Sequence, residues 1–240
     1  MADIIDINTL FGPRPKEASD LSLDDLLALR ETYSVTTSFT LSTIGILLDF
    51  RSGNSATLAA CSDNPGLLPA ATINPQKCFD IPNTIDEIVQ KGFKLLRVFP
   101  EIQDWEPDYA PFITLVRALK NKPLPLMVDV SKPGVASRIM KTCENSNVTV
   151  ILSGVDETCL AEAVTLMQEN PNLYMETSHL LGEGVIAHVA RLTDDSKLLF
   201  GTGSPANPVL SSLTAIEIAD ITDSARSNIL AGNARRLLNL

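Results

Sequence analysis

Short apolar segments alternate along the chain with segments in which apolar residues return every three or four positions. Short apolar runs bounded by polar residues are typical of buried strands, and the longer periodic segments are typical of helices. We predict eight strands, at 3–8, 35–41, 67–74, 93–99, 124–130, 148–152, 173–178 and 197–201. The predicted helices lie at 21–32, 55–63, 84–91, 109–120, 133–144, 157–169, 184–192 and 224–238.

Capping residues mark two of the predicted helix starts. Ser22 precedes an apolar segment and is followed three positions later by Asp25, and Thr222 precedes the last helix. Hydroxyl side chains at such positions accept hydrogen bonds from the backbone N–H groups that the first helical turn leaves unpaired. The two residues therefore mark the starts of these predicted helices.

The predicted elements follow one another as strand and helix, repeated along the chain. Strands that are apolar on both faces are typical of a parallel sheet covered by helices, and about eight such units favour closure into a barrel. We therefore predict an α/β fold, a (β/α)₈ TIM barrel, as one domain over residues 1–240. An open, doubly wound sheet is the alternative, but residues 9–13 contain no Gly-x-Gly-x-x-Gly turn for a dinucleotide.

Composition and charge narrow the range of partners. The formal net charge of −10 would repel a phosphate backbone, so we expect no nucleic-acid partner. The chain shows no signal-peptide pattern and no apolar stretch near the roughly 20 residues that cross a bilayer, so we expect a cytoplasmic protein without a membrane partner. The four cysteines show no Cys-x-x-Cys spacing and are predicted to be free thiols. We expect no cofactor, and a small-molecule ligand and a homo-oligomer both remain open.

The longest irregular stretches, 12–21 and 101–108, both follow predicted strands. They would project from the carboxyl-terminal face of a barrel, where barrel enzymes place their active sites. Trp105 lies in the second stretch, where it could act as a lid, stack on a ligand or contact another subunit.

Three segments carry a family resemblance. They are Ile5-Asp6-Ile7-Asn8-Thr9-Leu10-Phe11-Gly12, Leu199-Phe200-Gly201-Thr202-Gly203-Ser204-Pro205 and Ile229-Leu230-Ala231-Gly232-Asn233-Ala234-Arg235-Arg236-Leu237-Leu238. The first two are similar to an Ile-Asp-x-His-x-His-x-Gly start and a Phe-Gly-Ser-Asp-x-Pro turn. Together the segments resemble the amidohydrolase-related (β/α)₈ hydrolases and decarboxylases, which depend on a metal ion in most members.

The metal ligands that this resemblance implies are missing. The histidines of the first strand fall on Asn8 and Leu10, and the aspartate after strand eight falls on Gly203. The histidines of strands five and six fall on or near Asp129 and on Ser153 or Gly154. A zinc site needs three or four imidazole, thiolate or carboxylate donors, and the chain has only two histidines. We therefore predict no metal site.

Polar residues at the ends of the predicted strands form the candidate site. We predict ligand-binding roles for Asn8, Asn74, Arg97, Ser153, Ser178 and Ser204, and catalytic roles for Asp129, Glu176 and His179. Arg97 and Asp129 end neighbouring strands and are expected to pair across the barrel mouth. The pair would be structural, in a pocket that has lost its activity, or catalytic, with Arg97 binding a substrate carboxylate and Asp129 acting as a base.

Glu176 and His179 bracket the end of strand seven. Because side chains alternate along a strand, only one of the two need point into the mouth. A carboxylate and an imidazole could transfer protons near neutral pH. The alternative is a structural Glu176 and a solvated or helix-capping His179. Asp6 matches the family's aspartate and is expected to be structural, as an acceptor of hydrogen bonds in the first strand.

Two functional hypotheses remain. The first is a catalytically degenerate barrel that has lost the His/Asp metal centre and binds a small molecule or a protein. The alternative is a hydrolase or decarboxylase that works without metal on a small carboxylate or lactone substrate at the carboxyl-terminal mouth of the barrel.

Overall fold

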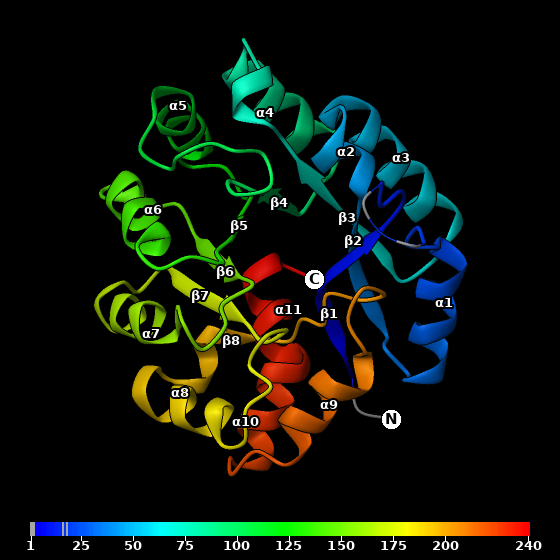
Figure 1. The fold of residues 1–240 in the computed structure, drawn as a ribbon, viewed down its shortest axis with the longest axis vertical. Helices are drawn as coiled ribbons and strands as arrows, with labels where there is room; N and C mark the ends of the chain where they lie inside the picture. The colour runs from blue at the N-terminus through cyan, green and yellow to red at the C-terminus, as the bar shows by residue number, and fades with distance from the viewer. Residues whose placement is uncertain (1–2, 16, 18) are drawn as a thin grey trace.

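Eight parallel strands form one sheet in the order β1 to β8 and are surrounded by a layer of helices (Figure 1). The computed structural model describes residues 3–15, 17 and 19–240. The strands are β1 Ile5–Phe11, β2 Thr37–Ser42, β3 Leu67–Thr72, β4 Leu95–Val98, β5 Leu126–Asp129, β6 Val150–Ser153, β7 Leu173–Glu176 and β8 Leu198–Leu199. Backbone hydrogen bonds from Ile7 to Phe200 (3.0 Å) and from Gly203 to Asn8 (2.7 Å) bring the end of the sheet back to its start. The fold is a (β/α)₈ TIM barrel, as predicted.

The helices follow the strands along the chain. They are α1 Leu23–Thr32, α2 Thr43–Leu47, α3 Phe50–Asp63, α4 Ile81–Gln90, α5 Ala110–Leu119, α6 Val135–Cys143, α7 Leu160–Glu169, α8 Val185–Thr193, α9 Val209–Glu217, α10 Asp223–Ser227 and α11 Asn233–Leu238. The hydroxyls of Ser22 and Thr222 accept backbone hydrogen bonds at the starts of α1 and α10, as predicted. Within the described part of the chain, every helix is too short or too polar to cross a membrane.

All eight predicted strands are present, but the helix prediction was incomplete. It missed α2 and α9, and the predicted last helix is divided by a π-helical segment, Asn228–Gly232. The short α2 lies directly on α3, where a Cβ on Gly53 would come within 2.2 Å of the Gly45 Cα. Two facing glycines allow this close approach of backbones, which a periodicity of apolar residues does not reveal.

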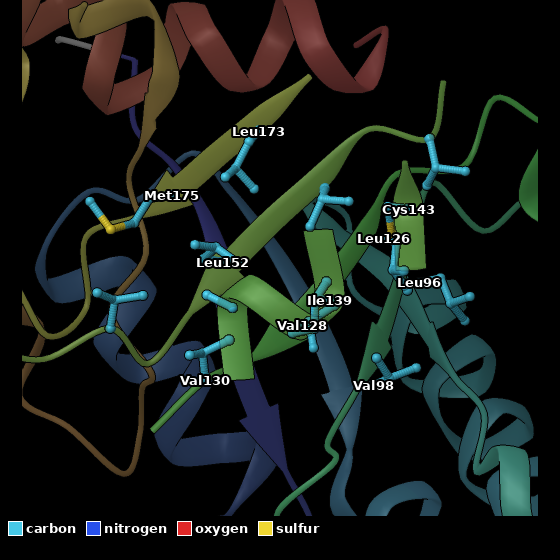
Figure 2. Close-up of a cluster of buried hydrophobic side chains, with 14 of the residues drawn as sticks. Leu96, Val98, Leu126, Val128, Val130, Ile139, Cys143, Leu152, Leu173 and Met175 are labelled. Atoms are coloured by element: carbon cyan, nitrogen blue, oxygen red, sulfur yellow. The ribbon is translucent and has the colours of Figure 1, made fainter. Parts of the chain in front are cut away.

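Apolar side chains pack in two layers, one on each side of the strands. The inner cluster fills the barrel and includes Ile5, Phe39, Leu95, Met127, Ile151 and Leu199. The outer cluster lies between strands and helices, and Figure 2 shows the part where Leu126 and Val128 of β5 meet Ile139 and Cys143 of α6. Burying each such side chain stabilises the fold by roughly 1.5–3 kcal/mol.

The C-terminal segment closes one end of the barrel. Ala234 and Leu238 of α11 belong to the inner cluster, and α11 lies at the centre of the ring of strands in Figure 1. Leu237 and Leu238 line a cavity with residues 122–125 and 147–149, which precede β5 and β6. The segment therefore covers the amino-terminal end of the barrel.

Trp105 is part of the core, so a role as lid, ligand-stacking ring or subunit contact is excluded by its position. Only 6% of its surface is exposed, and its ring packs against Tyr109 and Phe112 at centroid distances of 5.6 and 5.2 Å. Its Nε1 donates a hydrogen bond to Gln103 (3.0 Å). Trp105 therefore anchors the loop after β4 in the core. The four cysteines are free thiols, as predicted.

Candidate active site at the barrel mouth

The alternation of side chains brings four predicted site residues to the inner side of the mouth. Arg97, Asp129 and Ser153 each lie two positions beyond a residue of the inner cluster, and Glu176 ends β7. Because successive side chains of a strand point to opposite faces, a spacing of two keeps these residues on the inner face. The carboxyl ends of β4 to β7 therefore present a polar layer above the apolar interior.

A bulge in β1 adds Asn8 to this layer. Asp6 pairs with Ser38 of β2, but the next pairing joins Thr9 to Thr40, so β1 has one extra residue between these points. Bulges of this kind redirect a side chain. Here the Asn8 amide turns inward and donates to Ser153 Oγ (3.3 Å), across the mouth.

Glu176 is the centre of a hydrogen-bond network. Its Oε1 accepts from Asn8 Nδ2 (3.2 Å), Ser153 Oγ (2.9 Å), the Gly154 amide (3.1 Å) and Ser178 Oγ (2.8 Å). Its Oε2 accepts from the Ser178 amide (2.7 Å), and the side chain is buried. A carboxylate has about four acceptor positions, so this one has little capacity left for a ligand. We interpret Glu176 as a positioning residue.

Arg97 brings a buried positive charge to the same layer. Its Nη2 donates to Asn8 Oδ1 (2.7 Å) and its Nη1 to the Thr9 carbonyl (3.4 Å), and only 2% of its surface is exposed. The guanidinium lies 5.2 Å from the Phe99 ring centroid. Burial lowers the pKa of Arg97, while nearby carboxylates, Asp129 first among them, raise it. A guanidinium has five N–H donors, so these two hydrogen bonds leave capacity for an anionic ligand.

Asp129 differs from Glu176 in having no hydrogen-bond partner among the described residues, and it is only partly buried. The predicted ion pair with Arg97 does not form, because Arg97 bonds to Asn8 and Thr9 instead. Desolvation raises the pKa of Asp129 to about 6, although the charge of Arg97 acts in the opposite direction. A carboxyl group with this pKa exchanges protons near neutral pH.

His179 lies outside the polar layer, so of the two residues that bracket the end of β7 only Glu176 points inward. The imidazole is exposed, and its Nδ1 lies 2.9 Å from Ser178 Oγ. Because Ser178 Oγ donates its proton to Glu176, it acts as the acceptor for His179 Nδ1–H. The other ring nitrogen, Nε2, is then the one with a free lone pair.

Two of the residues predicted to bind a ligand, Asn74 and Ser204, make structural contacts. Asn74 Oδ1 accepts from the Gln76 amide (3.0 Å) and caps a short 3₁₀ turn after β3. Ser204 is buried and is joined to β1 through its carbonyl, which accepts from the Leu10 amide (2.9 Å).

Asp6 accepts backbone hydrogen bonds, as the sequence predicted. Its carboxyl accepts from the Asn8 amide (3.0 Å), the Thr202 amide (3.1 Å) and Thr202 Oγ1 (2.5 Å). Burial raises the pKa of Asp6 to about 7 against the opposing hydrogen bonds of Thr202. The side chain ties β1 to the segment after β8, close to the closure of the barrel.

Thr72 is a site residue that the sequence analysis missed. It pairs with Arg97 across β3 and β4, so both side chains are on the inner face. Thr72 is fully buried, and its hydroxyl has no partner within the described part of the chain. The spacing of two residues from Ala70, which is in the inner cluster, is the signal that identifies it.

The donors at the mouth do not fit the metal centre that the family resemblance implies. Among the described residues, no three His, Cys, Asp or Glu side chains are grouped so that they could hold a metal ion. The one ligating oxygen of Asn8 already accepts from the Arg97 guanidinium, whose positive charge would repel a cation there. Leu10, Gly154 and Gly203 have no donor side chains.

Comparison with known proteins gives a family match and solved structures with a similar fold. A family model for amidohydrolases matches residues 14–240. Among curated proteins, none shows significant sequence similarity to the chain. The fold is similar to that of 5-carboxyvanillate decarboxylase from Sphingomonas paucimobilis, with a TM-score of 0.79 and 13% identity over 100% of both chains.

Two further solved structures share the fold. A 2,6-dihydroxybenzoate decarboxylase from Rhizobium has a TM-score of 0.78 and 14% identity over 100% of this chain and 99% of its own. A dihydroxybenzoic acid decarboxylase from Polaromonas sp. JS666 was solved with bound manganese and the inhibitor 2-nitroresorcinol. It has a TM-score of 0.78 and 14% identity over 100% of this chain and 98% of its own. At such identities the likeness shows the fold alone.

Proposed function

The chain belongs to the amidohydrolase family, and on that premise we propose that it is an enzyme that hydrolyses or decarboxylates a small carboxylate-bearing substrate at the barrel mouth. In this proposal Arg97 binds the negative charge of the substrate and Asp129 transfers the proton. Asn8, Ser153 and Ser178 position these groups through their contacts with Glu176.

The observation that carries the proposal is the contrast in hydrogen bonding at the mouth. Asp129 is the carboxyl group there without a partner among the described residues, and its pKa is raised to about 6. It is close enough to Arg97 for the guanidinium charge to affect its ionisation. An anion site beside a proton-transfer group is the minimum for acid–base catalysis on a carboxylate substrate.

Both reactions can be written with these two side chains. In decarboxylation the bond to the carboxyl carbon breaks, CO₂ leaves, and the electron pair on the remaining carbon takes a proton from the protonated Asp129. In hydrolysis the Asp129 carboxylate takes a proton from the attacking water, and Arg97 donates hydrogen bonds to the oxyanion that forms at the carbonyl. When the oxyanion collapses, the bond to the leaving oxygen breaks, and Asp129 returns the proton to that oxygen. Neither sequence of steps involves a metal ion.

The comparisons favour this enzymatic function over a catalytically degenerate binding protein. Both functions would use Arg97 as an anion site, so anion binding does not distinguish them. A binding protein has no need of a proton-transfer group, whereas the enzyme requires one at Asp129. The two functions therefore differ in the effect expected for a change at that carboxyl.

The test is a turnover assay on lactones, esters and aromatic acids that follows both CO₂ release and acid release. We expect Asp129→Asn to lower kcat by about 100-fold or more while binding is retained, because general acid–base catalysis contributes roughly that factor. Arg97→Lys should raise KM, because lysine cannot reproduce the planar guanidinium contacts. His179→Ala measures the contribution of the exposed imidazole. Unchanged turnover in Asp129→Asn would contradict the proposed role, and stoichiometric metal in the active protein would contradict a metal-free mechanism.

A further inference from the structure

Thr72, at the end of β3, has a hydroxyl group that is buried without a protein partner. The side chain is fully buried, and its Oγ1 has no hydrogen-bond partner within the described part of the chain. A hydroxyl group that loses its water on burial without gaining a partner destabilises the fold. The stability of the barrel therefore does not explain why a hydroxyl is present at this position.

The register of the strands places Thr72 next to Arg97. The two residues pair across β3 and β4, and neighbouring strands lie roughly 4.8 Å apart, so both side chains leave the inner face of the barrel side by side. Arg97 donates to Asn8 and to the Thr9 carbonyl, and its guanidinium has further N–H groups. The mouth thus has two adjacent donor groups, one charged and one neutral.

Two contacts hold Thr72 in a defined orientation. Asn54 of α3 binds its backbone twice, because Nδ2 donates to the Thr72 carbonyl (2.9 Å) and Oδ1 accepts from the Thr72 amide (2.8 Å). A Cβ on Gly45 would lie 2.6 Å from Thr72 Cγ2, so the methyl group packs against α2 where a glycine makes room for it. Since Cγ2 and Oγ1 are separate branches of Cβ, the hydroxyl points in another direction than the contact with α2.

The carboxyl groups around Arg97 balance its charge. Asp129, Glu176 and Asp6 all act on the guanidinium as negative neighbours. The mouth as a whole is therefore not positively charged, and it can stabilise negative charge only through hydrogen bonds directed at the atom that carries it. A neutral donor such as the Thr72 hydroxyl contributes to such stabilisation as well as a charged one.

Two donors at one point favour hydrolysis over decarboxylation. In hydrolysis water attacks the carbonyl carbon, the π electron pair moves to the carbonyl oxygen and Asp129 takes the proton, so negative charge develops at the oxygen that the donors face. In decarboxylation negative charge leaves the carboxylate as CO₂ forms. The same donors would then stabilise the substrate more than the transition state, which slows the reaction.

We propose that Thr72 is a catalytic residue, and that its hydroxyl and the Arg97 guanidinium both donate hydrogen bonds to the oxyanion formed during hydrolysis of an ester or lactone. The inference rests on the proposed function, because Asp129 must take the proton of the attacking water. When the oxyanion collapses, the bond to the alcohol oxygen breaks, and that oxygen takes the proton back from Asp129. Of the two proposed reactions, this assignment selects hydrolysis.

Thr72→Val tests the role of the hydroxyl, because valine keeps the branched shape that packs against Gly45. The assay follows acid release from phenyl acetate, acetylsalicylate and δ-valerolactone. We expect kcat to fall by about 100-fold and KM to change by less than about threefold, because the lost hydrogen bond forms only in the transition state. Thr72→Ser keeps the hydroxyl and should restore kcat to within about fivefold of the wild-type value. The denaturation midpoint of Thr72→Val should be no lower than that of the wild type, because an unpartnered hydroxyl does not stabilise the fold.

Thr40→Val is the matched control. Thr40 is also fully buried, and its hydroxyl likewise has no partner among the described residues. It lies between Phe39 and Leu41 of the inner cluster, so its side chain points to the outer face of β2, away from the mouth. This variant should leave kcat and KM unchanged.

The inference is overturned if Thr72→Val retains kcat or only raises KM, if Thr72→Ser fails to restore kcat, or if Thr40→Val loses as much activity. It is also overturned if the wild type releases CO₂ from aromatic acids but hydrolyses none of the three esters and lactones. In these cases the proposed function stands as long as Asp129→Asn lowers the turnover that is observed. A wild-type protein that turns over no acid, ester or lactone would reject the proposed function and the inference together.

Discussion

Two carboxyl groups at the same end of the barrel, Glu176 of β7 and Asp129 of β5, have opposite surroundings. Glu176 is buried and accepts five hydrogen bonds. Asp129 is partly exposed and has no partner among the residues that the structure describes. The same functional group, a carboxyl, therefore has a different role in each of the two residues. The saturated carboxylate joins β1, β6 and β7 across the mouth, whereas the unsaturated one keeps its oxygens available for a ligand or a proton.

The glycines beside the two carboxyl groups, Gly201 and Gly154, also differ in their surroundings. A Cβ on Gly201 would lie 2.3 Å from Glu176 Oε2, so the absence of a side chain there makes room for the saturated carboxylate. At Gly154 the corresponding distance to Asp129 Oδ2 is 3.3 Å, and the backbone φ is +73°. The first glycine is therefore required by packing, and the second mainly by backbone conformation.

The largest effect is expected for Glu176→Gln, which keeps the shape of the side chain but replaces one acceptor oxygen by a donor. An NH₂ group facing the Ser178 amide leaves two donors opposed, and the charge that strengthens the other hydrogen bonds is lost. We expect the free energy of unfolding to fall by about 3 kcal/mol. Denaturant titration measures it.

Glu169→Gln is the control for this change, because Glu169 is exposed at the end of α7. It should alter stability by less than about 0.5 kcal/mol. A Glu176→Gln variant as stable as the control would mean that the network does not organise the mouth.

The second prediction compares the two glycines. Gly201→Ala should lower the free energy of unfolding by about 2–3 kcal/mol, because the new methyl group overlaps a buried carboxylate that cannot move away. Gly154→Ala should cost about 1 kcal/mol, the strain of a left-handed residue with a Cβ. Chemical denaturation of both variants measures which one loses more free energy of unfolding. Equal losses would contradict the view that packing requires Gly201 and backbone conformation requires Gly154.

The smallest effect is the pH dependence that Asp129 contributes to stability. Its pKa is about 6 in the folded protein and 3.8 ordinarily, so the folded state binds this proton more tightly than the unfolded state. The stability from that preference is present below about pH 4 and is lost as the pH rises through 6. Partial exposure of the side chain limits the effect to about 1 kcal/mol.

Asp129→Asn removes this titration. The variant should therefore gain stability relative to the wild type between pH 4 and pH 7, which parallel denaturant titrations at the two pH values would measure. A difference between the two proteins that stays constant with pH would show that the carboxyl is not desolvated.

The sequence predicted the fold well because a repeated barrel unit leaves a repeated pattern. The eight strands are short apolar segments, and their order determines the topology. The α2 helix was missed because it has five residues and depends on the contact between Gly45 and Gly53. Trp105 was misplaced because an aromatic residue in an irregular stretch has no periodicity that indicates its burial.

The residues of the candidate site were predicted better than the contacts between them. The ends of the strands identified Arg97, Asp129 and Glu176, and the structure brings these residues to one layer. The bulge in β1 could not be predicted, because it depends on the pairing with β2, and it is the bulge that turns Asn8 toward Arg97. The expected pair of Arg97 and Asp129 was wrong for this reason, since Asn8 takes the position of the partner.

The C-terminal segment that closes the barrel affects how the protein is made. Ala234 and Leu238 complete the same apolar interior that Ile5 begins, and Arg235 forms an ion pair with Asp3 at 2.6 Å. During synthesis the first strand therefore leaves the ribosome more than 200 residues before the helix that covers its end of the barrel. Until then the inner cluster lacks the contacts of Ala234 and Leu238, so this end of the barrel is completed only after α11 has been made.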